Sequence, residues 1–323
     1  TAYVLLHHYM GDVDGNVGSW GFARGGMGAV ANSIAGAFQA YGGEIRSDAG
    51  VDKIIVKNGK ATGVALENGE EISARLVVSS MDVKRTFLQC MDQSHLPKEF
   101  YNRVKHFKIR GSSGKLNIAL DGMPEFPALP KGSSLYHSDM HFIDSPERFE
   151  RAYDDWKAGT WSKDPYVDMV MPTTIDPTMA PPGKHFMSCF IQYCPHQIEG
   201  RDWTSEEKDQ FAQTVIDQIA NYSPNFKDLI VHYEVRTPSV IEEEIGITEG
   251  NIFHGELTMD QLLFNRPVPG YAQYRSPVGG LYMCGSSTHP GGGVMAAPGA
   301  NAAREILADL GRQNTVPENF GDD

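Results

Sequence analysis

The stretch that most constrains the fold of this chain is residues 280–303, near the end of its 323 residues. The apolar run from Leu281 to Cys284 predicts a short buried strand, and Gly285 permits a sharp exit from it. Three consecutive glycines follow at 291–293, and an alanine-rich sequence from about Val294 predicts a helix whose first N–H groups can meet an anion or a ring edge. This order of elements holds cofactors in α/β proteins. The pattern alone leaves two interpretations open, a cofactor site and the packing of a strand–helix joint.

Residues 285–299 read GSSTHPGGGVMAAPG, which is similar to the C-terminal flavin-contacting motif of the phytoene dehydrogenase-like FAD-dependent oxidoreductases, where carotenoid desaturases carry G-x-x-T-H-P-G-x-G. The resemblance covers the chain from Gly25 to Leu310. It is most similar to one subgroup, the pyridine nucleotide-disulphide oxidoreductase domain-containing proteins. The upstream positions that extend the match are residues 250–254, Asp260, Gln261, Arg266, Pro267, Tyr274 and Pro277.

This resemblance implies FAD as the cofactor of the full-length protein and assigns its contacts by position. The adenine half would meet the Val51 backbone, Ser79 and Ser80; the ribityl–pyrophosphate part would meet Gly285 and Ser286; the pyrimidine edge of the ring would meet Gly293, Val294 and Met295. Many flavoproteins place Asp or Glu just after the first of these glycines. Ser286 and Ser287 stand there instead, as in the subgroup, which weakens any transfer from classical reductases.

The implied activity is transfer of a hydride from a C–H bond of a small apolar substrate to the flavin, which carries the chemistry itself. His254 and His289 are the titratable residues nearest the inferred site, and no catalytic residue is assigned. His254 fits either an acid–base partner or a packed side chain, and packing is slightly favoured. The alternative is a non-catalytic binding or regulatory protein on a flavoprotein scaffold, because fold does not fix function.

Residues 25–31, GGMGAVA, contain a formal G-x-G-x-x-A before a predicted helix that ends at Gly42-Gly43. A dinucleotide fingerprint needs a buried strand directly before it, and residues 19–24 are interrupted by glycine and end in Arg24. We therefore reject that interpretation. Because the chain opens on the apolar sequence after Thr1, we expect a C-terminal fragment that lacks the N-terminal Rossmann unit, with FAD absent from the fragment and the fragment inactive alone.

Two Asn-Gly pairs, at 58–59 and 68–69, are hairpin signals between strand-like runs. They predict a three-stranded meander of Val51–Lys57, residues 61–67 and residues 70–73. Leu76-Val-Val78 then predicts a strand buried on both faces, with Ser79 and Ser80 at its carboxyl end.

The predicted fold is therefore α/β (α+β): a partial FAD-binding domain of the glutathione reductase type, with its β-meander, plus a substrate domain with an antiparallel or mixed sheet backed by helices. Residues 1–82 and 274–312 would form the flavin part, 83–273 the substrate-binding domain, and 313–323 a polar tail.

The net charge of −13 argues against nucleic acid and against electrostatic docking on anionic lipid. No apolar run approaches the roughly 18 residues of a membrane span, which leaves peripheral membrane contact and self-association open. Cys90, Cys189, Cys194 and Cys284 form no C-x-x-C, which favours buried thiols and a reducing intracellular compartment, cytoplasmic in a bacterium or mitochondrial in a eukaryote. No metal site is predicted, because His137 and His141 on strand-like sequence would lie about 13 Å apart.

Overall fold

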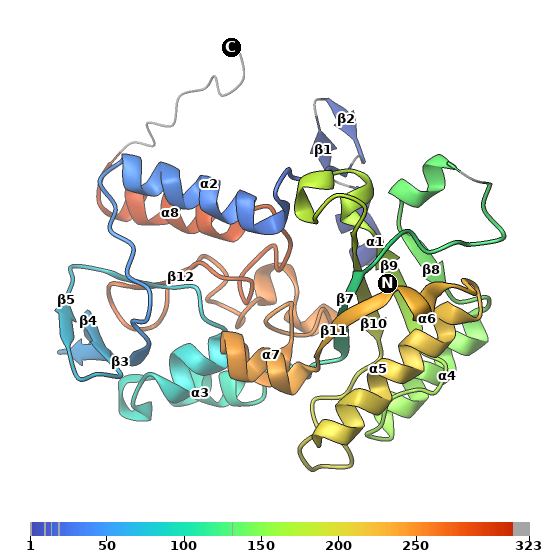
Figure 1. Cartoon of the computed structure of the whole chain (residues 1–323). Coiled ribbons are helices and arrows are strands. Elements are labelled where there is room, and N and C mark those ends of the chain that lie inside the picture. Colours follow the sequence, from blue (N-terminus) through green and yellow to red (C-terminus); the bar gives the residue numbers. More distant parts are fainter. Residues whose placement is uncertain (1, 10, 14, 19, 131, 313–323) are drawn as a thin grey trace. The chain divides into compact units, whose positions relative to one another are not determined.

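The computed structural model describes residues 2–9, 11–13, 15–18, 20–130 and 132–312 (Figure 1). The predicted tail, 313–323, lies outside the described residues. The chain divides into two compact units. The first comprises Thr1–Arg46 and Gly111–Ile241, and the second comprises Ser47–Arg110 and Glu242–Asp323. The assignment of 1–82 and 274–312 to flavin binding and of 83–273 to substrate binding stays a prediction.

The first unit is built on a five-stranded sheet in the order β11-β7-β10-β9-β8. Every pairing in it is antiparallel, so of the two expected arrangements, antiparallel and mixed, this unit has the antiparallel one. Its strands are β7 (Ser113–Leu120), β8 (Met140–Phe142), β9 (Tyr166–Val170), β10 (His185–Gln192) and β11 (Ile230–Arg236). Burial alternates along the strands, as expected when one face is covered and the other is open to polar groups.

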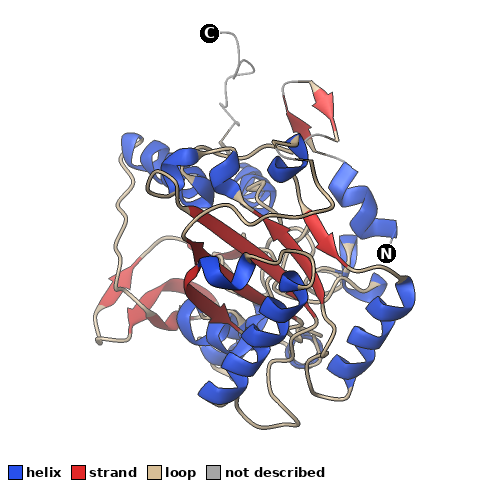
Figure 2. Cartoon of the chain, turned by 45° about the vertical axis from the view of Figure 1, so that its right-hand side comes forward, coloured by secondary structure: helices blue, strands red, loops and turns tan. Residues whose placement is uncertain are grey.

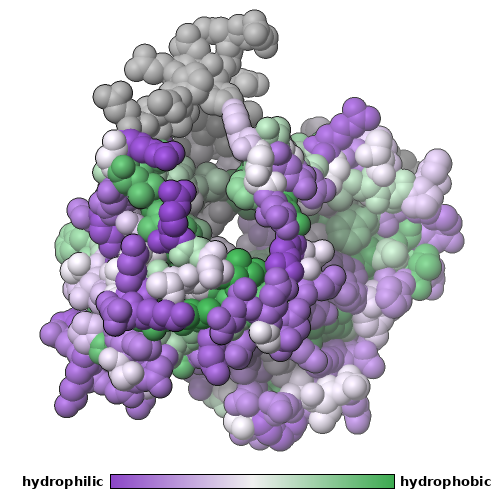
Figure 3. Space-filling view, turned by 90° about the vertical axis from the view of Figure 1, so that its left-hand side faces the viewer, coloured by the Kyte–Doolittle hydropathy of each residue, from purple (hydrophilic) through white to green (hydrophobic). Residues whose placement is uncertain are grey.

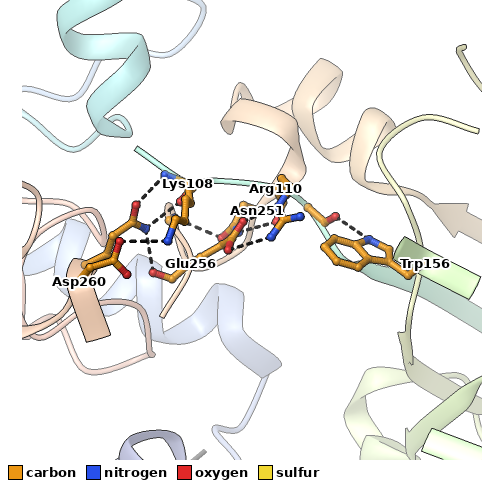
Figure 4. A network of polar contacts seen from close by, with 9 residues as sticks. Lys108, Arg110, Trp156, Asn251, Glu256 and Asp260 are labelled. Carbon is orange, nitrogen blue, oxygen red and sulfur yellow. Dashed lines mark hydrogen bonds and ion pairs between the residues drawn. The ribbon is translucent and has the colours of Figure 1, made fainter. Parts of the chain in front are cut away.

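Helices α4 (Pro146–Lys157) and α5 (Ser205–Ala220) lie against this sheet (Figure 2). The predicted capping box opens α5: the Thr204 hydroxyl accepts from the Glu207 N–H at 3.2 Å, and Glu207 accepts from the Thr204 N–H at 2.9 Å. Phe211, Val215 and Ile219 of α5 are fully buried in the core below the sheet. At the end of α4, the Trp156 indole donates to the Gly111 carbonyl at 3.1 Å (Figure 4).

The remaining elements of the first unit are short or peripheral. Helix α2 begins after Gly25, whose φ is 81°, and none of its residues is buried. No strand forms among residues 20–25, so the requirement for a dinucleotide fingerprint before α2 is not met. His137 ends a 3-10 turn and His141 lies on β8, so the two do not share one strand as expected. The short or peripheral elements of the first unit are α1 (Ala2–Tyr9), β1 (Asp12–Val13), β2 (Asn16–Val17), α2 (Gly26–Ala40), α6 (Phe226–Leu229) and α7 (Pro238–Ile245). The last residues of α7, from Glu242 on, are assigned to the second unit.

The second unit contains the predicted meander, β3 (Val51–Lys57), β4 (Lys60–Leu66) and β5 (Glu71–Ser73), paired antiparallel in that order. Its first turn is of the two-residue type with positive φ at Asn58 (51°) and Gly59 (73°). The second turn is longer than the predicted one. Only Gly69 has positive φ, and its N–H donates to the Leu66 carbonyl at 2.9 Å.

A second, two-stranded sheet pairs β6 (Val77–Ser79) with β12 (Leu281–Met283) in parallel. All three residues of β12 are buried, but Val78 is 46% exposed. The prediction that this strand is buried on both faces is therefore wrong, because only one face of β6 lies against the core of the unit. The other helices are α3 (Lys98–Lys105), a π-helix (Arg85–Gln89) and α8 (Ala297–Asp309).

Candidate functional site

The two parallel strands of the second unit end side by side and bring three predicted flavin contacts together. The Cys284 N–H donates to the Ser79 carbonyl at 2.8 Å, so the chain leaves both strands at the same level. A Cβ atom on Gly285 would overlap the Ser80 carbonyl group, lying 2.9 Å from its carbon and closer to its oxygen. Only glycine fits there. Ser79, Ser80 and Gly285 thus meet at the carboxyl edge of the sheet, where open α/β sheets bind ligands.

The loop that follows, residues 285–296, is the centre of the candidate site. Its first part is held by its own residues: the Thr288 N–H and hydroxyl both donate to the Gly285 carbonyl, at 3.0 and 2.8 Å. Gly292 is buried against Phe253, where a Cβ would come within 3.3 Å of the ring. Residues 293–296 are exposed instead, with Val294 72% and Met295 41% exposed. The first part of the loop is therefore held by hydrogen bonds and packing, whereas residues 293–296 are exposed to solvent.

Helix α8 begins at Ala297, three residues later than the sequence predicts, with Ala296 in the left-handed region at φ 52°. Pro298 near the helix start has no N–H and suits the first turn. Gly293, Val294 and Met295 consequently belong to the loop before the helix, and their backbone groups are not tied into its first turn.

Arg266 is the side chain that fixes this loop, and sequence reasoning gave it no role. The side chain is fully buried. Its Nε and Nη2 donate to the Ser286 carbonyl at 3.0 and 2.8 Å, and Nη2 also donates to the Phe253 carbonyl at 2.7 Å. Nη1 lies 3.3 Å from the Gln261 carbonyl. One guanidinium thus connects the glycine-rich loop to the segment around 253–261.

That segment is in turn anchored to residues 108–110 (Figure 4). Arg110 makes a two-pronged ion pair with Glu256, at 2.7 and 3.2 Å. Asn251 donates to the Arg110 carbonyl at 2.8 Å and accepts from the Phe253 and Gly255 N–H groups. Lys108 pairs with Asp260 at 3.0 Å. These contacts position the carbonyl groups that receive Arg266.

Asp82 and Ser287 form a second set of buried contacts that the sequence did not reveal. Asp82 accepts from the Thr248 N–H and hydroxyl at 3.0 and 2.8 Å, and from two N–H groups at the start of the π-helix. The Ser287 hydroxyl donates to the His254 carbonyl at 2.7 Å and accepts from the Val83 N–H at 3.1 Å. In the sequence, the only feature that pointed to Asp82 or Ser287 was its position close to a predicted flavin contact, Ser80 for Asp82 and Ser286 for Ser287.

The two candidate histidines lie in the same unit as this loop. Burial lowers the pKa of His254, and the nearby Arg266 adds to this effect while Asp82 opposes it. Burial and Arg266 also lower the pKa of His289. The Nδ1 atoms of both rings are buried and have no hydrogen-bond partner. Both imidazoles are therefore held neutral near pH 7 beside one cation.

The other predicted contacts have structural partners of their own. The Ser79 hydroxyl is buried and lies 2.8 Å from the Thr86 hydroxyl. Val51 begins β3, and its carbonyl lies 3.8 Å from the Cys90 sulfur. Ser80 is exposed and Ser286 is half-buried. Ser80 and residues 293–295 are thus the predicted contacts that are exposed.

Neither a metal centre nor a membrane span emerges from the described residues. Their His, Cys, Asp and Glu side chains form no group of three or more that could hold an ion. None of the helices within the described ranges combines the length and the apolar character needed to cross a bilayer.

Comparison with known proteins places the chain in a family. Residues 5–307 match the model of the family described as flavin containing amine oxidoreductase. Pyridine nucleotide-disulfide oxidoreductase domain-containing protein 2 of Mus musculus is 39% identical over 318 residues, 96% of this chain and 55% of that protein. The phytoene desaturase (neurosporene-forming) of Cereibacter sphaeroides is 29% identical over 294 residues, 90% of this chain and 53% of the desaturase.

Among solved structures, the cyclohexylamine oxidase from Brevibacterium oxydans IH-35A superposes with a TM-score of 0.51 at 16% identity, covering 89% of this chain and 53% of that one. This likeness shows a shared mixed α/β fold. The chain spans about half the length of the curated relatives it matches. Because the family model covers most of the sequence, the chain belongs to the flavin-containing amine oxidoreductase family.

Proposed function

We propose that the protein is an FAD-dependent dehydrogenase or desaturase that removes hydride from a C–H bond of an apolar substrate. The observation that carries this proposal is the joint ending of β6 and β12, where Gly285 lies against Ser80, followed by a loop whose residues 293–295 are exposed directly before helix α8. The similarity to the phytoene desaturase supports desaturase-like chemistry.

The residues at this edge fit the ring half of a flavin. The backbone N–H groups of the exposed residues 293–295 suit the electron-rich pyrimidine edge, and the positive end of the 13-residue helix α8 adds to them. The Ser286 hydroxyl suits a ribityl or phosphate oxygen. When bound, FAD supplies a hydride acceptor; the chain's own groups position the ring and stabilise the negative charge that reduction places on it.

His289 and His254 would act in this site as neutral groups. A neutral imidazole with an unpaired Nδ1 can donate or accept one proton at that atom, depending on its tautomer. The Tyr274 hydroxyl donates to the His289 carbonyl at 2.8 Å and fixes the backbone of this residue. The second interpretation, a binding or regulatory protein on the same scaffold, would use the same loop without substrate turnover.

The test is to titrate the 323-residue chain with FAD and with FMN and to measure binding by the quenching of flavin fluorescence. We expect the purified chain to be colourless, because no strand precedes the glycines of α2, and to quench both flavins with similar weak affinity. ADP should not compete. Gly293→Asp should weaken binding at least tenfold by placing a carboxylate at the pyrimidine edge, whereas Ala303→Asp, on the exposed side of α8, should not.

Two results would count against this assignment. If neither flavin is quenched at saturating concentration, the loop does not hold a flavin ring. If the chain purifies with stoichiometric flavin absorbing near 450 nm, Gly26 and Gly28 form the dinucleotide turn after all, and the account of which glycines matter is overturned. Consumption of substrate by the reconstituted flavoprotein would separate the enzyme from the regulatory alternative.

A further inference from the structure

The first unit contains a cavity of about 820 Å³ whose lining residues have no part in the proposed flavin site. It lies between the loop that follows β7 and the 3-10 turns Ser134–His137 and Pro172–Thr174. All of its lining residues belong to the first unit. Its volume falls within the range of roughly 300–1,000 Å³ that is usual for small-molecule sites.

The walls of this cavity are apolar and are held in place by hydrogen bonds. The Phe126 ring is buried 6.1 Å from the Tyr136 ring, and the Leu129 N–H donates to the Phe126 carbonyl at 2.8 Å. The Thr174 hydroxyl lies 3.1 Å from the Tyr136 carbonyl and joins the two 3-10 turns. The apolar and aromatic lining comprises Met123, Pro124, Phe126, Pro127, Leu129 and Tyr136. The cavity is therefore formed before any ligand binds.

His185 reaches this cavity from the first residue of β10, on the same face of the sheet as the buried Met187. Its ring lies beside Thr173, which is buried: the two side chains approach to 3.0 Å between Nδ1 and Oγ1. Thr173 Oγ1 also accepts from the Phe186 N–H at 3.3 Å. The cavity thus meets the sheet at the end of β10, on its core side.

The contact with Thr173 determines which imidazole nitrogen carries the proton. Within the described ranges, the Thr173 hydroxyl has no hydrogen-bond partner besides the Phe186 N–H and His185, so its own proton finds an acceptor only at Nδ1. The imidazole proton is then on Nε2. Burial lowers the pKa of His185, which keeps the ring neutral near pH 7. His185 therefore offers a ligand one neutral N–H donor.

Tyr136 supplies a second neutral donor. Its hydroxyl oxygen accepts from the Phe126 N–H at 3.2 Å, and its own O–H has no acceptor among the described residues. The same holds for Nε2 of His185. Of the described residues that line the cavity, none is Lys or Arg, and Glu125 is the one carboxylate. The lining thus combines an aromatic surface with two uncharged donors.

Donors of this kind favour a ligand that brings an acceptor, because a hydrocarbon in the same place leaves them unsatisfied. We propose that the cavity binds a neutral carbonyl compound with an aromatic body, whose oxygen accepts from His185 Nε2 and whose ring lies against Phe126 and Tyr136. This ligand is neither FAD nor the substrate that the flavin oxidises. The site therefore adds a binding function to the proposed activity.

The experiment uses prodan, a fluorescent naphthalene ketone whose emission shifts to the blue in apolar surroundings, titrated into the 323-residue chain without flavin. Two competitors share one skeleton: 2-acetonaphthone carries the carbonyl and 2-ethylnaphthalene does not. We expect saturable binding of prodan, displacement by 2-acetonaphthone, and at least about fivefold weaker displacement by 2-ethylnaphthalene, because the hydrocarbon leaves the donors unpaired. The anion 2-naphthoate should compete less well than the ketone, since no described lining residue is Lys or Arg.

His185→Leu should weaken binding of 2-acetonaphthone by about 5- to 50-fold and that of 2-ethylnaphthalene by less than about twofold. His185→Gln, which keeps an N–H donor, should retain most of the affinity for the ketone. His232→Leu is the matched control, because His232 is an exposed histidine of β11 in the same unit and does not line the cavity. Far-UV circular dichroism checks that each variant folds, and quenching of FMN should be unchanged in all three.

Equal displacement by 2-acetonaphthone and 2-ethylnaphthalene would overturn the proposal, since apolar contact alone would then explain binding. Tighter binding of 2-naphthoate than of the ketone would overturn the neutral class of ligand. Unchanged affinity of His185→Leu for the ketone would also count against the site; if this variant does not fold, the two competitors on the unaltered chain still decide. Loss of FMN quenching with intact ketone binding would count against the proposed flavin site alone.

Discussion

Gly285 and Ser80 lie so close that no side chain fits between them: a Cβ on Gly285 would overlap the Ser80 carbonyl. The contact joins the chain just after β12 to the chain just after β6, so it fixes the edge at which the proposed flavin contacts meet. A position can require glycine because its φ is positive or because another group approaches the backbone closely. Close approach explains Gly285, and the approaching group belongs to the chain itself and not to a ligand.

Gly285→Ala should therefore lower the free energy of unfolding by about 1–3 kcal/mol, the usual cost of overpacking. Urea denaturation followed by circular dichroism measures the change. Gly299→Ala is the control, since a Cβ at Gly299 meets nothing within 4 Å and alanine favours the helix α8 in which it lies. Equal midpoints for the two variants would contradict the packing role of Gly285.

Arg266→Met should destabilise the second unit by about 3 kcal/mol or more, because it leaves the carbonyls of Ser286, Phe253 and Gln261 without their buried donor. We also expect faster limited proteolysis within residues 285–296. Arg103→Met, which removes an exposed ion pair with Glu99, should change stability by at most about 0.5 kcal/mol. Similar proteolysis of both variants would mean that Arg266 does not hold the loop.

His254 and His289 should make stability depend on pH in a defined window. Both have a folded pKa below the ordinary value, so the unfolded chain binds protons more readily as the pH falls through about 6.5. The free energy of unfolding should be highest above that pH and fall between pH 8 and 5.5. The double variant His254→Gln/His289→Gln should show a smaller fall, measured by urea denaturation at each pH. His95→Gln, at an exposed histidine, should keep the full fall; an unaltered fall in the double variant would contradict the prediction.

All four cysteines are free, and we expect thiol titration of the denatured, unreduced chain to find four. The native chain should react slowly. Burial raises the pKa of Cys189 to about 12 and that of Cys194 well above its ordinary value, so little thiolate is present. Fewer than four thiols after denaturation would point to a disulfide.

Helix α2 should promote self-association. Ile34, Phe38 and Tyr41 recur at helical spacing and are 55%, 52% and 88% exposed. Exposed apolar surface of this kind tends to be buried against another chain. Hydrophobic groups also lie among hydrophilic ones on the face drawn in Figure 3. Sedimentation velocity should show concentration-dependent association that Ile34→Glu/Phe38→Glu abolishes and Gln39→Glu leaves intact. A monomer at all concentrations would refute this prediction.

The local sequence determined those turns and helix ends that interactions between neighbouring residues define. The Asn58-Gly59 pair placed the first hairpin turn, and the Thr204/Glu207 capping box placed the start of α5. In each case the deciding interaction joins residues only a few positions apart, so the pattern is visible in the chain. The resemblance of residues 285–299 likewise indicated the family.

Tertiary structure alone decided the rest. Nothing near Arg266 in the sequence shows that it is fully buried and bonds Ser286, because that contact depends on how two loops pack. The exposure of Val78 depends on which residues cover strand β6. The start of α8 at Ala297 depends on the contacts that hold the preceding loop. The register of the five-stranded sheet pairs Lys115 with Phe190 and Phe190 with Asp168, which are 75 and 22 positions apart in the sequence, and side-chain packing on the buried face sets it.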